Sequence, residues 1–181
     1  MRIRLLIGML LLVASAFAQE RSPSTPEERQ RYLKIVSALE KQPLGSANVD
    51  SKDVRWALQW LIDVPDVRVS QCGGPVTLGL LRSRKKIAHE LIFRASLAMG
   101  AYNIQHPEFG PDSPQQQQAG LESVLKAYTA AVQQHPADRI KALDELVDKQ
   151  KAGQLSEAAA VEAANCGGAK QSARLGPWLP R

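Results

Sequence analysis

Apolar residues recur every three or four positions through most of the chain, the spacing of an amphipathic helix. Capping residues and prolines divide this pattern into separate helices. The expected helices lie between Thr25 and Pro43, Ser51 and Pro65, Val76 and Ile104, Ser113 and Pro136, Ile140 and Gly153, and Ser156 and Asn165. The pattern therefore predicts an all-α fold, an irregular bundle of about five to six helices.

The third expected helix, residues 76–104, is the longest and is apolar on two sides in its later half. A helix with two apolar faces usually lies in the centre of a bundle, with neighbours packed around it. We therefore predict a long central helix. The following run Gln115–Gln118 is expected to form the exposed start of the next helix, after the cap Ser113.

The first eighteen residues have the three parts of a secretory signal peptide. Arg2 and Arg4 precede an apolar run over residues 5–13, and Ala16 and Ala18 form a small-x-small cleavage site before Gln19. This apolar run is shorter than the roughly 20 residues that span a bilayer. We predict cleavage near Ala18 and export to the periplasm or the exterior, with no transmembrane segment in the mature chain.

The remaining residues suit one domain. We expect a disordered lead-in over 19–25, a single α-helical domain over 26–168 and a loop-like tail over 169–181. Without residues 1–18 the chain keeps 21 basic and all 18 acidic residues, a net charge of +3. That balance lacks the dense basic patches of nucleic-acid-binding proteins, so no nucleic-acid partner is expected.

The two cysteines occur in similar settings, Cys72 and Cys166 each being followed by two glycines. Two thiols in an exported chain usually pair as a disulfide. A metal site would need further ligands at short spacing, and no histidine lies near either cysteine in the sequence. A disulfide is therefore expected to join the loop after the second helix to the end of the last helix.

Basic residues are densest between positions 82 and 86. On a continuous helix, Arg82, Lys85, Lys86 and His89 fall within an arc of about 100°. Such an arc could bind a phosphate, an anionic lipid head group or an acidic partner, whereas most charge runs are solvated helix faces. We take these four residues as the candidate site for an anion or a partner.

Other reactive residues carry no recognisable motif. His89-Glu90 resembles the start of a zincin motif, but Phe93 occupies the place of the second histidine. His106 and His135 both precede proline at expected helix ends, where a cation is favourable. Trp56 and Trp60, four apart, could stack a flat ligand but are more often core and rim residues. No catalytic residue, metal ligand or cofactor is expected.

Part of the C-terminal half is similar to a tetratricopeptide repeat over about one and a half units. Tyr128, Ala131 and Pro136 occupy the aromatic, small and proline positions of a second repeat helix, and Gly153 and Ala158 suit a following unit. The resemblance implies a helical protein-interaction domain. The sequence thus predicts a binding or scaffold module of the cell envelope or secreted space, with a protein or anionic envelope component as partner. An enzyme whose site is assembled from scattered residues is the alternative.

Overall fold

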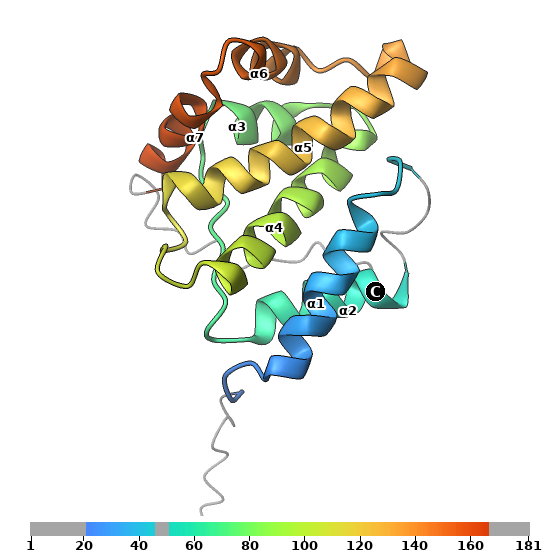
Figure 1. The fold of residues 1–181 in the computed structure, drawn as a ribbon. Helices are drawn as coiled ribbons and strands as arrows, with labels where there is room; N and C mark the ends of the chain where they lie inside the picture. Colours follow the sequence, from blue (N-terminus) through green and yellow to red (C-terminus); the bar gives the residue numbers. More distant parts are fainter. Residues whose placement is uncertain (1–20, 46–50, 167–181) are drawn as a thin grey trace, which may run out of the picture.

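The computed structural model describes residues 21–45 and 51–166. The predicted signal peptide, its cleavage site and the tail over 169–181 lie outside the described residues. The described residues contain seven α-helices, one 3-10 turn and no strand, which confirms the all-α class (Figure 1). The elements are α1 (Pro26–Leu39), α2 (Lys52–Asp63), α3 (Pro75–Arg82), α4 (Ile87–Gln105), α5 (Pro114–Gln134), η2 (Pro136–Asp138), α6 (Lys141–Lys151) and α7 (Leu155–Ala164). None of these described helices is long and apolar enough to cross a membrane.

Local capping signals account for the starts of α1, α2 and α5. Thr25 forms the expected capping box with Glu28, and the hydroxyls of Ser51 and Ser113 accept hydrogen bonds from backbone N–H groups in the first turns of α2 and α5. The helix α7 differs from expectation, because Gln154 occupies its N-cap and the predicted cap Ser156 lies inside the first turn. Helix N-caps can be predicted from the sequence because the two hydrogen-bonded partners lie within three residues of each other.

The predicted long helix over 76–104 is wrong in one respect, because residues Ser83–Lys86 interrupt it. Ser83 is extended (φ −69°, ψ 134°), so that α3 and α4 are separate helices, and the described chain has seven helices where about five to six were expected. A Cβ at Gly79 would lie 2.6 Å from the Cβ of Ala142, which shows how closely α3 approaches α6. The α4 helix packs mainly on α5. One straight helix could not follow both neighbours.

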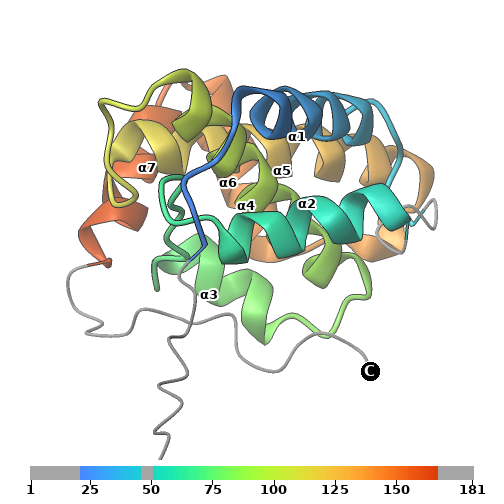
Figure 2. The same ribbon diagram turned by 90° about the horizontal axis from the view of Figure 1, so that it is seen from below.

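The helix α4 occupies the centre of the bundle, as its two apolar faces predicted (Figures 1 and 2). Leu91 and Met99 face a core shared with α3, α5, α6 and α7. Leu97 belongs to a second core, formed with α1, α2 and the loop after α2. Within that second core, the buried Tyr32 hydroxyl donates to the Leu97 carbonyl at 3.0 Å. The two cores meet across α4, which therefore holds the two parts of the domain together.

An extended segment, residues 67–72, runs between the helices and has its backbone groups bound by side-chain amides. The Arg68 N–H donates to Asn103 Oδ1 (3.1 Å), and the Arg68 carbonyl accepts from Gln116 Nε2 (2.8 Å). The Ser70 carbonyl accepts from Gln117 Nε2 (3.0 Å). Gln116 and Gln117 are buried for this reason, so the expectation that the glutamine run is exposed is wrong at these two positions.

Two buried charged side chains serve helix ends distant in sequence. Arg94, 2% exposed, donates to the carbonyls of Leu39 (2.8 Å) and Pro43 (3.3 Å) after α1, and pairs with Glu90 at 2.9 Å. Carbonyls at a helix C-terminus lack intrahelical donors, so a cation there supplies the missing hydrogen bonds. Arg94 thus fixes the end of α1 against the central helix.

Glu162 in α7 accepts hydrogen bonds from the free N–H groups at the N-terminus of α3. Its carboxylate, 1% exposed, accepts from the N–H of Val76 (2.8 Å) and from the N–H (3.3 Å) and hydroxyl (2.9 Å) of Thr77. The local N-cap, Gly74, has no side chain to do this. A Cβ at Gly74 would collide with the Glu162 carboxylate, so glycine leaves the space that the carboxylate occupies.

Candidate functional site

The cysteine pair is joined as predicted. Cys72 and Cys166 form a disulfide, with their Cα atoms 4.5 Å apart and a sequence separation of 94. The bridge lies beside the contact of Glu162 with α3, so a covalent bond and a buried carboxylate both hold the end of α7 to the start of α3. Cys72 is buried, and its role is structural.

The four residues of the candidate basic site do not share one helix. Arg82 is the last residue of α3, Lys85 and Lys86 lie in the connection, and His89 lies in the first turn of α4. All four side chains are exposed. The break therefore replaces the predicted helical arc by a short cationic connection, and Lys85 Nζ donates to the Ala137 carbonyl at 2.5 Å.

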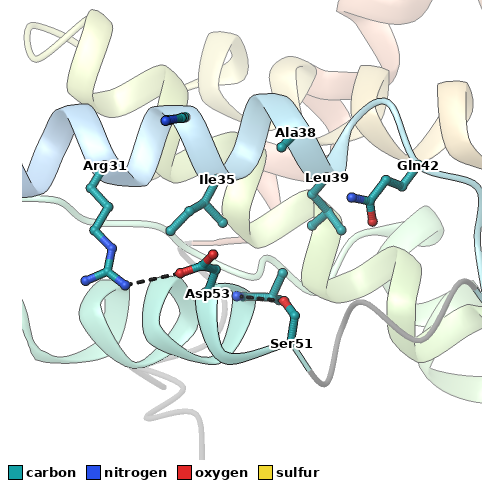
Figure 3. A pocket seen from close by; sticks show the side chains of 9 residues that line it. Arg31, Ile35, Ala38, Leu39, Gln42, Ser51 and Asp53 are labelled. Atoms are coloured by element: carbon teal, nitrogen blue, oxygen red, sulfur yellow. Dashed lines mark hydrogen bonds and ion pairs between the residues drawn. The ribbon is translucent and has the colours of Figure 1, made fainter.

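A groove between α1 and α2, which the sequence did not reveal, is hollowed into the described surface (Figure 3). Its volume is about 490 Å³. Figure 3 shows Arg31 at one end of the groove and Gln42 and Ser51 toward the other. The lining residues are Arg31, Lys34, Ile35, Ala38, Leu39, Gln42, Ser51, Asp53 and Val54.

Arg31 stands at one end of the groove with its guanidinium group held from two sides. One guanidinium nitrogen lies 3.2 Å from Asp53 Oδ1, and the guanidinium carbon lies 3.9 Å from the centroid of the Trp56 ring. The Arg31 side chain is 51% exposed, so it keeps N–H groups open to solvent. Arg31 is thus positioned for a further anionic contact.

The tryptophan pair fills the expected core and rim positions. Trp60 is 2% exposed and packs against the buried Tyr32 ring, with the ring centroids 4.7 Å apart. Trp56 is half-buried and lies beneath Arg31. The two rings are therefore occupied by Tyr32 and Arg31 and do not form an open stacking platform.

The middle of the groove is apolar. Ile35 and Leu39 point between the two helices (Figure 3), and Val54 also lines the groove. Gln42 Oε1 is buried and has no hydrogen-bond donor among the described residues. A buried acceptor without a donor costs about 1–3 kcal/mol, so Gln42 Oε1 is suited to accept a hydrogen bond from a bound group.

The arrangement favours binding over proton transfer or metal chemistry. The titratable groups that line the groove are Arg31, Lys34 and Asp53, and the Asp53 carboxylate is already paired with Arg31. Over residues 21–45 and 51–166, no three His, Cys, Asp or Glu side chains are grouped as metal ligands. His106 stacks on Tyr102, with ring centroids 4.4 Å apart, and occupies the C-cap of α4; His135 occupies the C-cap of α5.

No protein-family model, curated protein or solved structure matches this chain. The similarity to a tetratricopeptide repeat around Tyr128 therefore stays a prediction from a few residues. In the structure the Tyr128 hydroxyl accepts from the N–H of Ile140 (2.9 Å) and donates to Asp144 Oδ1 (2.8 Å), which joins α5 to the start of α6.

Proposed function

We propose that this protein is an exported helical binding module that holds an extended acidic segment of a partner protein between α1 and α2. The observation that carries the proposal is the groove itself, an apolar channel with positioned cations along one wall. A peptide bound there would place aliphatic side chains against the apolar floor and carboxylates beside the cations. Its backbone N–H groups would donate to Gln42.

Export rests on two independent features. The N-terminal pattern is that of a cleaved signal peptide, and a disulfide between distant cysteines is stable in an oxidising compartment. Protein recovered outside the cytoplasm is expected to begin at Gln19. Mass spectrometry of its N-terminal peptide would establish this, and recovery of exported protein that retains Met1 would contradict it.

The cations of the groove favour an acidic ligand. Arg31 and Lys34 lie three residues apart on α1, so their side chains are neighbours on one helix face. Asp53 is the one acidic residue among the lining residues. Because Asp53 and Trp56 already hold the Arg31 side chain, little rotamer entropy remains for Arg31 to lose when it binds a carboxylate.

The apolar floor and Gln42 favour an extended peptide over a small ion. Alternate side chains of an extended chain point to opposite sides, so every second residue can reach the floor at Ile35 and Leu39. The backbone N–H groups between them are the donors that Gln42 Oε1 lacks among the described residues. A free carboxylate or phosphate would leave the floor and this acceptor unused.

The test uses two fluorescein-labelled peptides, one of alternating Asp and Leu and one of alternating Lys and Leu. Fluorescence anisotropy is expected to show binding of the Asp peptide in preference to the Lys peptide. Lys34→Glu should weaken binding of the Asp peptide about tenfold, because an attraction becomes a repulsion, and should strengthen binding of the Lys peptide. Lys34 is exposed, so the fold should tolerate the change.

Lys149→Glu is the matched control, because it makes the same charge change at an exposed position of α6. Its affinity for both peptides should stay within about twofold of the unaltered protein. Equal affinity of the two peptides, or equal effects of Lys34→Glu and Lys149→Glu, would refute the proposed site.

A further inference from the structure

The connection between α3 and α4 combines dense positive charge with an exposed apolar side chain. Four of the five residues in the segment Arg82–Lys86 are basic, and we call this segment the basic link. Leu81, directly before it, is 57% exposed, the highest value among the exposed large apolar side chains of the described chain. Figure 2 shows α3 at the edge of the bundle, with the connection to α4 turning at its outer end.

The charge of the basic link is poorly neutralised. Residues 19–168 hold eighteen basic and eighteen acidic residues, so four cations in five positions leave the rest of the domain with an excess of acids. Within the described ranges, Arg82, Arg84 and Lys86 have no acidic side chain within ion-pair distance, whereas Arg21, Arg29 and Arg31 each have one.

The surroundings of the basic link add further charges of both signs. Lys85 is bound to the Ala137 carbonyl, which brings the η2 turn alongside. Asp138 in this turn is partly exposed, and Arg139 after it pairs with Asp144 at 3.5 Å. Lys86 is the N-cap residue of α4, where the partial positive charge of the helix end adds to the cations. Basic groups remain in excess around the link.

The shape of this surface differs from that of a peptide site. None of the basic-link residues lines the α1–α2 groove or the small cavity between α3, α4 and α5. Long cationic side chains that follow an exposed leucine in the sequence can adapt to a flat and laterally mobile surface, which needs no shape complementarity. An anionic bilayer offers negative charge to the cations and an apolar layer within reach of a leucine.

We propose that the basic link and Leu81 attach the protein to the surface of an anionic lipid bilayer. The cations bind lipid phosphates, and the leucine enters the boundary between head groups and acyl chains. This attachment is peripheral and reversible, and it leaves the α1–α2 groove, on other helices, open for a second partner. It stands independently of the proposed peptide site.

The test measures cosedimentation of the protein without residues 1–18, with vesicles of phosphatidylcholine alone or with about one third phosphatidylglycerol. Binding is expected to need the anionic lipid and to be lost at about 0.5 M NaCl, where charges are strongly screened. The double substitution Arg84→Glu with Lys86→Glu should weaken vesicle binding at least twentyfold. Loss of each cation alone should weaken binding roughly fivefold, and the added negative charges should weaken it further. Leu81→Gln should weaken binding about fivefold without changing its salt dependence.

Lys52→Glu with Lys149→Glu is the matched control, with the same change in net charge at two exposed positions on α2 and α6. It should keep most of the vesicle binding, and so should Lys34→Glu, which separates this result from the groove. The tail cations Lys170, Arg174 and Arg181 are present in every variant, so a difference reports the basic link.

Three outcomes would overturn the proposal. One is equal binding to both kinds of vesicle, and another is equal loss in the basic-link and control variants. The third is that the protein binds soluble polyglutamate through the basic link but does not bind vesicles. That result would assign this surface to an acidic protein instead. Circular dichroism of each variant confirms that the helices are retained.

Discussion

Removing the Glu162 carboxylate tests whether α7 holds the start of α3. Glu162→Ala would leave the N–H groups of Val76 and Thr77 and the Thr77 hydroxyl without their acceptor. These groups are buried or partly buried, and Gly74 at the N-cap offers no side chain as a substitute. The disulfide next to this contact remains in the variant, so the chain still returns to the same place.

The expected loss of stability is about 3 kcal/mol. Loss of an N-cap costs roughly 1 kcal/mol, and stranding buried donors that bonded a charged acceptor costs a further 1–3 kcal/mol. For a domain of this size, 1 kcal/mol lowers the melting temperature by about 2–4 °C, so a decrease of about 6–12 °C is expected. Glu162→Gln keeps the volume and one acceptor oxygen and should lose about half as much.

Thermal and guanidinium unfolding, followed by circular dichroism, measure these differences. Glu157→Ala is the control, because Glu157 lies in the same helix but its side chain is exposed. It should cost no more than about 0.5 kcal/mol, the size of a helix-dipole effect. If Glu162→Ala is as stable as Glu157→Ala, the carboxylate does not hold the start of α3 and the reasoning fails.

Three further perturbations follow from the structure. Cys72→Ser should lower the free energy of unfolding by up to about 4–5 kcal/mol, from the chain-entropy relation for a loop of this length, and should raise proteolysis over residues 154–168. Detection of two reactive thiols in the folded, unaltered protein would contradict this prediction. Gly100→Ala should cost about 1–2 kcal/mol in a denaturant titration, because its Cβ would press on the buried Tyr32 hydroxyl and lie 2.9 Å from Leu61 Cδ1; Gly120→Ala, which meets the flexible Met99 side chain at 3.0 Å, should be near neutral. Partial burial raises the pKa of Asp66, but hydrogen bonds from Ser24 and Arg29 outweigh it and lower the pKa to about 2. Asp66 therefore stabilises the folded state above about pH 4, and this contribution is lost as the pH falls through 2. Asp66→Asn should therefore be less stable than the unaltered protein by about 1 kcal/mol at pH 7, discounted for exposure, and the difference should vanish near pH 2 in urea titrations.

The sequence predicted what local patterns determine. Five helices begin or end close to the expected residues because a cap, a proline or a glycine stands there, as at Thr25, Ser113 and Gly153. The disulfide could also be predicted, since two cysteines allow a single intramolecular pairing. The candidate basic residues were found by their density alone.

The errors arose where distant contacts override the local pattern. Nothing in Ser83–Lys86 strongly breaks a helix, and the interruption follows from the different neighbours of α3 and α4. Gln116 resembles a surface residue until the backbone of Arg68 is brought to it. The α1–α2 groove could not be predicted at all, because it depends on how two separate helices lie against each other and not on any motif.

The extended segment 67–72 has a consequence for the order of folding. Its hydrogen-bond partners, Ser96, Asn103, Gln116 and Gln117, come 25 to 48 residues later in the chain. Helices mostly form through near neighbours and therefore rapidly, whereas contacts at such separations require the intervening chain to close first. We therefore expect the segment to settle after α4 and α5 have come together, and Cys72 at its end to reach its native position beside Cys166 at that stage. In that order, oxidation of the pair would record a completed core and would not direct its assembly.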